Sequence, residues 1–558
     1  MPACPYIILY ERAETNRPTG SQLPETEMDM LYTSYGFIAF LAALFTAYYV
    51  VPRRVQKPVL LLFSLFFYAS YGVLQIVYIT FTALTTYISA RLISARKEAN
   101  TAYIEAHKKE LSRDEKKARR EAVKKKTYLI MSLCLIANFG ILAFLKYANF
   151  TIHNINSIVS LFGGRGEITF LSLTLPIGIS FYIFMSMGYV IDVYRGKYQA
   201  DKNFFHIALF IAYFPQLLLG PFSRYDDVKD TLFVPTKFSG RAFAFGIERI
   251  IWGFFKKLVV ADRVLIPLKV LIASPDKYPG TYVFAAMILY AARIYADFTG
   301  GIDITMGISE ALGIRLKENF IRPYFSKSVA EYWRRWHITL GDWFREYVFY
   351  PMSIWGPLTR LTKKTRPVFG AGFARRFPVY VSTVSVWFVT GIWHGASWNF
   401  IAWGMANCIV ILISSELTPL YDKFHKKTHL INKRPYHAFM MLRTFFLMGM
   451  IRMFDCYVGV GTTIRALVSM FTEGNWGVLV DGSMLKLGLS AADYIIVAAA
   501  ALLMFAVSVA GIKKSVRERL AAHPVAAFAT FASLALVTAV FGVYGIGYDS
   551  SQFIYTQY

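Results

Sequence analysis

The sequence predicts an all-α, polytopic integral membrane protein with about 10–12 transmembrane helices plus re-entrant or amphipathic helices. Apolar residue types make up 56% of the 558 residues and charged types only 17%, whereas soluble domains carry about 25% charged residues. Apolar runs recur from residue 33 to residue 545, and the basic residues collect between them. This pattern excludes a disordered chain, a collagen-like repeat and a disulfide scaffold.

Each predicted span is a mainly apolar run, since about 20 residues are needed to cross a bilayer. The spans lie near residues 33–51, 58–71, 73–91, 127–146, 171–193, 204–222, 281–308, 379–392, 398–414, 436–454, 493–511 and 523–545. Residues 240–266 contain the ionisable side chains of Glu248, Arg249, Lys256, Lys257, Asp262 and Arg263, so we expect an amphipathic or re-entrant helix there. Residues 1–31 carry no long apolar run and are predicted to be a disordered lead before a single domain at 32–558.

The basic loops predict the orientation of the chain in the cell membrane. Residues 91–126 hold thirteen Lys and Arg against six Asp and Glu, so 92–126 is expected to be a helical insert on the cytoplasmic side. The same rule places the loops 359–376, 422–443 and 513–519 in the cytoplasm. Both termini, including the tail 549–558, are then predicted to be extracytoplasmic. The net charge of +25 is explained by these loops and does not indicate nucleic-acid binding.

The segment 320–351 combines charge and aromatic residues in an unusual way. Ser328 and Glu331 form a capping-box pattern, so a helix is expected to begin there and to end at Pro351. Charges in lipid cost about 2.5–3.5 kcal/mol each at mid-bilayer. The helix must therefore line the protein interior or lie at the membrane interface. In the first case it would present His337 to an internal site, and in the second its tryptophans would form an aromatic belt.

A second candidate site is Gly391-Ile-Trp-His-Gly-Ala-Ser-Trp-Asn399, which lies between two apolar runs. His394 has no cation near it in sequence, and a neutral imidazole can accept a proton from a hydroxyl at physiological pH. The alternative is a hydrogen-bonded packing histidine.

A third candidate lies inside the predicted span 281–308, where Asp297 and Asp303 stand in an apolar context. These acids could pair with Arg334 or Arg335 as structural ion pairs, or they could shape a polar tunnel. The sequence contains no HExxH, no Walker A and no GxSxG motif, so no metal site, nucleotide hydrolysis or serine-hydrolase triad is predicted.

Four segments resemble the membrane-bound O-acyltransferase family, in particular its bacterial polysaccharide-modifying branch, which includes alginate O-acetylation and teichoic-acid D-alanylation proteins. They are LPIGISFYIFMSMGYVIDVYRG, FPQLLLGPFSRY, the long segment from DFTGGIDITMG to WRRWHITLGDWFREYVFYP, and WHGASWNFIAWG. The pairing of WRRWH with a downstream WHG is specific to this family, and the sequence around WRRWH is closer to that of the alginate-type members.

The resemblance implies a ring of helices around a central funnel whose thin floor separates acyl donor from acceptor. It identifies His394 with the family's near-invariant histidine and His337 with its second one. We interpret His394 as general base and His337 as the residue that orients the donor carbonyl or assists proton transfer. Substrate contacts are predicted for Arg334, Arg335, Asp297, Trp393 and Asn399.

The function implied is transfer of an acyl group, with acetyl favoured, from a cytoplasmic thioester across the membrane to hydroxyls of a cell-surface or secreted polysaccharide. The donor would be acetyl-CoA or an acyl carrier protein, no cofactor would be bound, and an extracytoplasmic acyltransferase partner would complete the transfer. One alternative is D-alanyl transfer to teichoic acid. An alternative of another class is a polysaccharide flippase or transporter, which the lack of internal repeats disfavours.

The C-terminal residues Phe553 to Tyr558 allow a further hypothesis. They resemble the aromatic tail of a small partner protein of D-alanylation systems, in which a terminal tyrosine is thought to carry the acyl group. Tyr558 could act as such a carrier here, because a phenol is easier to deprotonate than an alcohol and its ester is a better acyl donor. The alternative is an aromatic anchor at the membrane interface.

Overall fold

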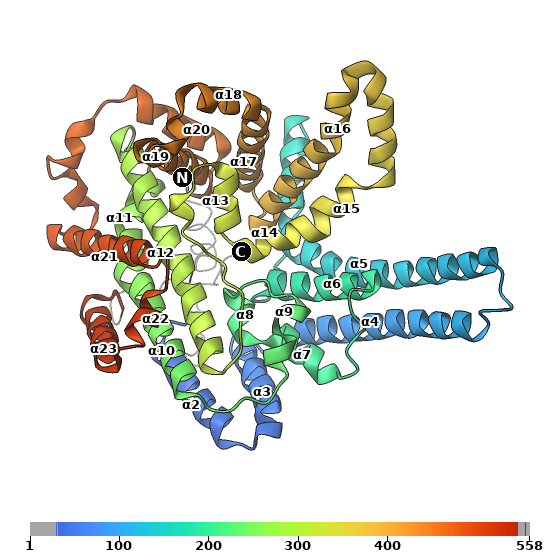
Figure 1. The fold of residues 1–558 in the computed structure, drawn as a ribbon. Coiled ribbons are helices and arrows are strands. Elements are labelled where there is room, and N and C mark those ends of the chain that lie inside the picture. The colour runs from blue at the N-terminus through green and yellow to red at the C-terminus, as the bar shows by residue number, and fades with distance from the viewer. Residues whose placement is uncertain (1–29, 31, 165, 545–552, 554–558) are drawn as a thin grey trace. The chain divides into compact units, whose positions relative to one another are not determined.

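The computed structural model describes residues 30, 32–164, 166–544 and 553. Throughout these residues the regular structure is helical, apart from one isolated bridge between Phe320 and Trp336. They divide into two compact units (Figure 1). The first unit contains the described residues of Pro24–Phe243 and Ser309–Lys317, and the second contains those of Ala244–Ile308 and Glu318–Tyr558.

The first unit is built from long apolar helices followed by short ones. They are α2 (Tyr35–Val50), α3 (Gln56–Ala69), α4 (Gln75–Ala106), α5 (Arg113–Leu161), α6 (Ile179–Arg195), α7 (Phe204–Ala212), α8 (Phe214–Leu218) and α9 (Tyr225–Leu232). Helices α4 and α5 run side by side as a long hairpin in Figure 1. Their turn is fixed by Ser112, whose side chain accepts from the N–H of Glu115 in a capping box. The insert at 92–126 is thus helical, as predicted.

The second unit carries the motifs singled out in the sequence. Its helices are α10 (Gly240–Phe254, which begins in the first unit), the π-helical η2 (Phe255–Ala261), α11 (Asp262–Ala273), α12 (Thr281–Ala311), α13 (Val329–Arg335), α14 (Ile338–Phe344), η4 (Arg345–Phe349), α15 (Tyr350–Ser353), α16 (Gly356–His394), α17 (Trp398–Glu416), α18 (Thr418–Thr428), α19 (Arg434–Arg452), α20 (Val460–Thr472), α21 (Ala491–Ala510), α22 (Val516–Leu520) and α23 (Pro524–Phe541). Short 3₁₀ segments, η1 (Arg53–Val55), η3 (Pro323–Phe325), η5 (Leu430–Asn432), η6 (Met453–Asp455), η7 (Trp476–Leu479) and η8 (Ser483–Leu487), occupy connections in both units.

Small residues allow α10 and α12 to pack at backbone distance. A β-carbon on Gly253 would lie 2.6 Å from the carbonyl oxygen of Gly300, and one on Gly307 would lie 2.6 Å from that of Gly246. Gly246 and Gly253 are seven residues apart in α10, and Gly300 and Gly307 are seven residues apart in α12. The close approach therefore extends over two turns of each helix. Close packing through glycine is typical of helix pairs in membranes.

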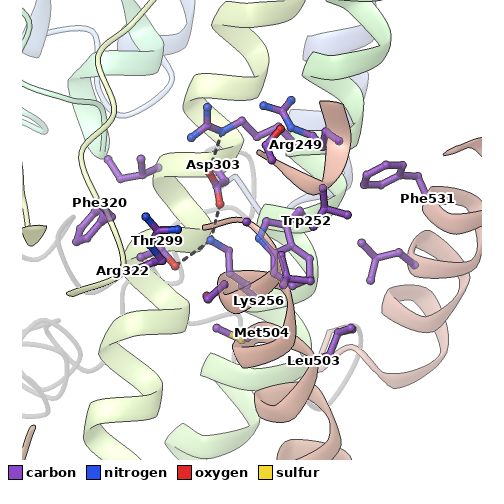
Figure 2. A pocket seen from close by; sticks show the side chains of 18 of the residues that line it. Arg249, Trp252, Lys256, Thr299, Asp303, Phe320, Arg322, Leu503, Met504 and Phe531 are labelled. Atoms are coloured by element: carbon purple, nitrogen blue, oxygen red, sulfur yellow. Dashed lines mark hydrogen bonds and ion pairs between the residues drawn. The ribbon is translucent and has the colours of Figure 1, made fainter. Parts of the chain in front are cut away.

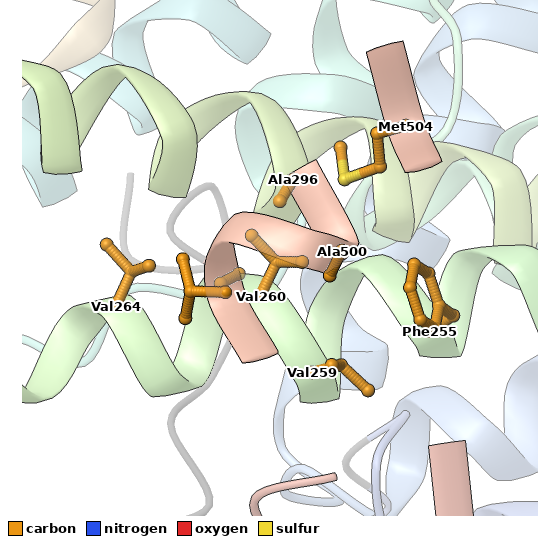
Figure 3. Close-up of a cluster of buried hydrophobic side chains, with 9 residues drawn as sticks. Phe255, Val259, Val260, Val264, Ala296, Ala500 and Met504 are labelled. Carbon is orange, nitrogen blue, oxygen red and sulfur yellow. The ribbon is translucent and has the colours of Figure 1, made fainter. Parts of the chain in front are cut away.

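The core beside this crossing is aliphatic. Phe255, Val259, Val260 and Val264 pack against Ala296 of α12 and against Ala500 and Met504 of α21 (Figure 3). The segment 240–266, predicted to be amphipathic or re-entrant, thus has an apolar face that packs against α12 and α21. Three of its ionisable side chains, Arg249, Lys256 and Lys257, form ion pairs with acids of α12, as described below.

Six helices in the described part of the chain are long and apolar enough to cross a membrane. They are α4, α5, α12, α17, α21 and α23, and they support the predicted polytopic membrane protein. The predicted span 204–222 is instead divided into α7 and α8, which meet at Tyr213. Pro215 stands at the start of α8, and a proline lacks the N–H that would continue the α7 ladder.

Candidate active site

The helix predicted to run from Ser328 to Pro351 is interrupted, and this correction defines the site. Its start is confirmed, because Ser328 caps α13 by accepting from the N–H of Glu331 at 3.1 Å. The helix then stops at Trp336, whose backbone is extended and pairs with Phe320. The N–H of Ile321 donates to the carbonyl of Arg335 at 2.9 Å, and the N–H of Ile338 donates to that of Asn319 at 3.0 Å. These long-range bonds replace helical ones and cannot be read from local sequence.

His337 occupies the break between α13 and α14 in a left-handed conformation, with φ 48°. A non-glycine residue pays about 1–3 kcal/mol for such a backbone, so packing must hold it. The ring of His337 lies edge to face with Phe298, with centroids 4.9 Å apart, and it is only 3% exposed.

Asn319 holds the imidazole of His337 through the Nδ1 atom of the ring. The Oδ1 atom of Asn319 accepts from the N–H of Thr339 at 3.1 Å and from its hydroxyl at 2.9 Å. Because a backbone N–H can only donate, the amide orientation is fixed, and Nδ2 of Asn319 faces Nδ1 of His337 at 3.1 Å. Nδ1 of His337 also lies 3.2 Å from Oδ1 of Asn319, so this contact suits either tautomer of the neutral ring.

His394 ends α16, where the chain turns back into α17. Gly391 and Gly404 bring the two helices into backbone contact, since a β-carbon on Gly404 would lie 2.4 Å from the carbonyl oxygen of Trp387. Ser397 then caps α17 by accepting from the N–H of Asn399 at 3.1 Å. The His394 ring lies beside this crossing, against Trp403 at a centroid distance of 4.5 Å.

Both histidines border the same cavity, which has a volume of about 350 Å³. The wall is formed by α13, α14 and the end of α16. The Trp393 indole contacts both imidazoles, with ring centroids 6.3 Å from His337 and 5.0 Å from His394. Residues 57 apart in sequence thus meet in one largely apolar chamber that also includes Arg334 and Asp342.

Arg452, which the sequence analysis did not single out, stands behind the tryptophans of this site. Its guanidinium lies over the rings of Trp336 and Trp333, 4.7 Å and 5.5 Å from their centroids, and pairs with Asp455 at 3.0 Å. Burial and the charge of Arg452 lower the pKa of His337 to about 3. An arginine near the end of the predicted span 436–454 was the available signal, because ionisable residues inside the membrane are functional candidates by default.

The acids of α12 are paired with other cations than predicted. Asp297 binds Lys257 at 2.8 Å, and Asp303 binds Arg249 at 2.8 Å and Lys256 at 2.5 Å. These partners belong to α10 and η2, which cross α12 at the glycines described above. The expected pairing with Arg334 or Arg335 is therefore wrong.

The remaining predicted contact residues are dispersed. Arg335 pairs with Glu331 at 2.6 Å. The Asn399 amide donates to the carbonyl of Tyr457 at 2.8 Å and to Thr463 at 3.2 Å, and so fastens α17 to the segment before α20. Among the described residues, the histidine cavity brings together His337, His394 and Arg334 and leaves Asp297, Arg335 and Asn399 outside its wall. Tyr558 lies outside the described residues. So do the lead at 1–31, except for Met30, and the tail 549–558, except for Phe553.

Comparison with known proteins gives one family and several relatives. Residues 199–360 match the model of the membrane-bound O-acyltransferase family. The chain is 35% identical over 274 residues to the probable alginate O-acetylase of Azotobacter vinelandii, covering 49% of this chain and 51% of that protein. It is 30% identical over 390 residues to the probable alginate O-acetylase of Pseudomonas aeruginosa, covering 70% of this chain and 66% of the relative.

A more distant relative is the teichoic acid D-alanyltransferase of Bacillus subtilis, 26% identical over 255 residues, or 45% of this chain and 60% of that protein. The matches thus span between 51% and 66% of the relatives' own lengths. The family match covers residues from α7 through the His337 break to α16, and the fold is that of a helical membrane protein. The chain is a multi-pass member of the membrane-bound O-acyltransferase family.

Proposed function

We propose that this protein transfers an acetyl group from a cytoplasmic thioester to hydroxyls of a cell-surface or secreted polysaccharide. The observation that carries the proposal is the single cavity bordered by two buried histidines, His337 and His394. The similarity to two probable alginate O-acetylases favours acetyl as the group and a polysaccharide as the acceptor. Acetyl-CoA or an acetylated acyl carrier protein would supply the thioester.

In the proposed reaction His394 removes the proton of the accepting hydroxyl. The oxygen then attacks the thioester carbonyl, the C–S bond breaks, and the thiolate leaves and takes up a proton. General-base catalysis of this kind contributes about 10²–10⁴-fold. In this proposal the neutral His337 ring carries its hydrogen on Nε2 and donates it to the carbonyl oxygen as negative charge develops there, which is the same kind of stabilisation that an oxyanion hole provides. Arg334, at the cavity wall, would hold the phosphates of the donor.

The basic loops support a topology in which the thioester arrives from the cytoplasm. The 92–126 hairpin would be cytoplasmic and both termini extracytoplasmic, and the acyl group would pass to the outer side for a separate acyltransferase partner to complete transfer to the glycan. Tyr558 is a candidate for an intermediate carrier on that outer side, where its phenol would receive the group as an ester.

A second candidate function keeps the site and changes the group. The similarity to a teichoic acid D-alanyltransferase favours D-alanine carried by a carrier protein. The two functions use the same proton transfers, so the cavity geometry does not discriminate between them. The identity of the labelled product discriminates between the two functions.

The test is acyl transfer by membranes that contain or lack the protein, with radiolabelled acetyl-CoA or a D-alanyl carrier protein as donor. We expect acetyl transfer to glycan with the wild type and a loss of at least 100-fold with His394→Ala. His523→Ala is the matched control, because this histidine is exposed and precedes α23. If folded His394→Ala keeps more than about a tenth of the activity, the general-base assignment is wrong.

A further inference from the structure

A second and larger cavity lies in the same unit, apart from the histidine chamber. It has a volume of about 640 Å³ and is bordered by α10, α12, residues 318–322 and the C-terminal helices α21, α22 and α23. This volume is in the range of small-molecule sites. The mechanism described above makes no use of it.

One side of this cavity is ionic. Arg249 donates from Nε to Asp303 at 2.8 Å and from both terminal nitrogens to Glu318 at 2.8 Å each. Lys256 donates to Asp303 and, at 2.8 Å, to the hydroxyl of Thr299. Figure 2 shows Asp303 between Arg249 and Lys256, with Arg322 beside Thr299. Two carboxylates thus face two cations, and the cluster is neutral before Arg322 is counted.

Arg322 adds an unbalanced positive charge to this wall. It is half-buried, and no carboxylate of the described residues lies within 4 Å of its guanidinium. Its backbone is left-handed, with φ 48°, a conformation that non-glycine residues adopt only where the surroundings enforce it. A half-buried cation without a carboxylate partner is expected to bind an anion, because charges out of water need compensation.

The opposite side is apolar and opens toward the bilayer. Leu503 of α21 and Phe531 of α23 both line this side of the cavity (Figure 2). Only 11% of the most apolar stretch of each of these helices is buried, so both are turned mainly to lipid. Leu503 is 42% exposed and Val537 is 37% exposed, so the slot between the helices is accessible from the membrane side.

The connection between α21 and α23 places this cavity near a charged membrane surface. It carries Lys513, Lys514, Arg517 and Arg519, and Arg517 also borders the cavity. A basic segment directly after an apolar helix lies at headgroup level. Basic pockets between transmembrane helices on the cytoplasmic side bind anionic lipid headgroups.

We propose that this cavity binds one anionic phospholipid, with its phosphate against Arg322 and one acyl chain in the slot between α21 and α23. The cation requires an anion, and the apolar wall requires a hydrocarbon chain on the same molecule. A zwitterionic lipid would place its own cation near Arg322 and lose this advantage. The inference is independent of the acyl-transfer reaction.

The test is native mass spectrometry of the full-length protein in detergent, titrated with phosphatidylglycerol or with phosphatidylethanolamine. We expect one phosphatidylglycerol to bind at least fivefold more tightly than phosphatidylethanolamine. Arg322→Gln should weaken phosphatidylglycerol about fivefold, the contribution of one arginine at an anionic surface. Arg519→Gln is the control, since Arg519 is not part of the described cavity wall and bonds the carbonyl of Ala510.

A second variant tests the chain slot separately. Val507→Trp should fill the slot and abolish binding, whereas Leu502→Trp, on a face that is 68% exposed, should not. Thermal melting of each variant without lipid controls for misfolding. Equal affinity for the two lipids, or unchanged affinity in folded Arg322→Gln, would overturn the proposal. Displacement of the lipid by millimolar glycerol 3-phosphate or by acetyl-CoA would also overturn it, because the site would then belong to a water-soluble phosphate.

Discussion

The crossing of α16 and α17 should be intolerant of a single added methyl group at Gly404. A β-carbon there would lie 2.4 Å from the carbonyl oxygen of Trp387 and 3.3 Å from the Cα of Gly391. Ordinary contacts of a β-carbon lie at 3.4–4 Å, so α17 must move away from α16 by about 1 Å to reach this range. Both atoms that obstruct it are backbone, and no side-chain rotation can relieve the clash.

The added methyl group should also lower activity, because His394 lies at this crossing. His394 ends α16 and its ring packs on Trp403, which directly precedes Gly404. A misplacement of about 1 Å at a reacting group costs on the order of 100-fold in rate, while the overpacking itself costs about 1–3 kcal/mol. We therefore expect Gly404→Ala to be folded, with a modestly lower melting temperature and a kcat reduced about 100-fold.

The assay is acetyl transfer per folded protein, with kcat and KM measured separately and melting followed on the same preparation. Gly140→Ala is the matched control, since Gly140 is inside α5 and a β-carbon there meets nothing within 4 Å. That variant should keep full activity and gain up to about 1 kcal/mol of helix stability. Wild-type kcat with an unchanged melting temperature in Gly404→Ala would refute the argument that this contact positions His394.

Four further outcomes are expected. His337→Gln should lower kcat at least tenfold with the melting temperature nearly retained, and a large fall in melting temperature would instead assign His337 to packing. The pKa of His337 is lowered from 6.5 to about 3. Its neutral form therefore stabilises the fold above pH 6.5, and this contribution is lost as pH falls toward 3. Between pH 7 and pH 4.5 the melting temperature should fall less in His337→Gln than in the wild type. Tyr558→Phe should abolish glycan acylation if the phenol carries the acyl group, and survival of full acylation would leave Tyr558 as an anchor. Protease added to intact cells should leave residues 91–126 uncut, because the positive-inside rule places them in the cytoplasm, and cleavage there would invert the proposed topology.

Much of the helical architecture was predictable, because length and hydrophobicity determine which segments can cross a bilayer. The predicted spans at 73–91 and 281–308 correspond to α4 and α12. The capping residue of α13 was also predictable from Ser328 and Glu331, since capping is a property of four consecutive residues.

The break at His337 was not predictable, for a physical reason. Local propensity favours a continuous helix from α13 into α14. The structure instead pairs the backbone of Trp336 with that of Phe320, a residue 16 positions earlier. Similarly, the partners of Asp297 and Asp303 come from η2 and α10, 40 to 54 residues away. Choices between several possible long-range partners require the three-dimensional arrangement, and a single sequence does not contain that information.

The surroundings of the two histidines argue for different chemical roles. Burial and the cation at Arg452 keep His337 neutral far below physiological pH, so its imidazole is a very weak base. Asn319 contacts Nδ1 of His337, and in the proposed reaction Nε2 carries the hydrogen and donates it to the carbonyl oxygen. A weakly basic donor suits the stabilisation of a carbonyl oxygen and is unsuited to removing a proton from a hydroxyl. In the proposed reaction the base is His394, which ends a different helix and packs on Trp403. Under this proposal both histidines have to border one chamber, since the base must reach the attacking hydroxyl while the donor reaches the oxygen of the carbonyl that is attacked.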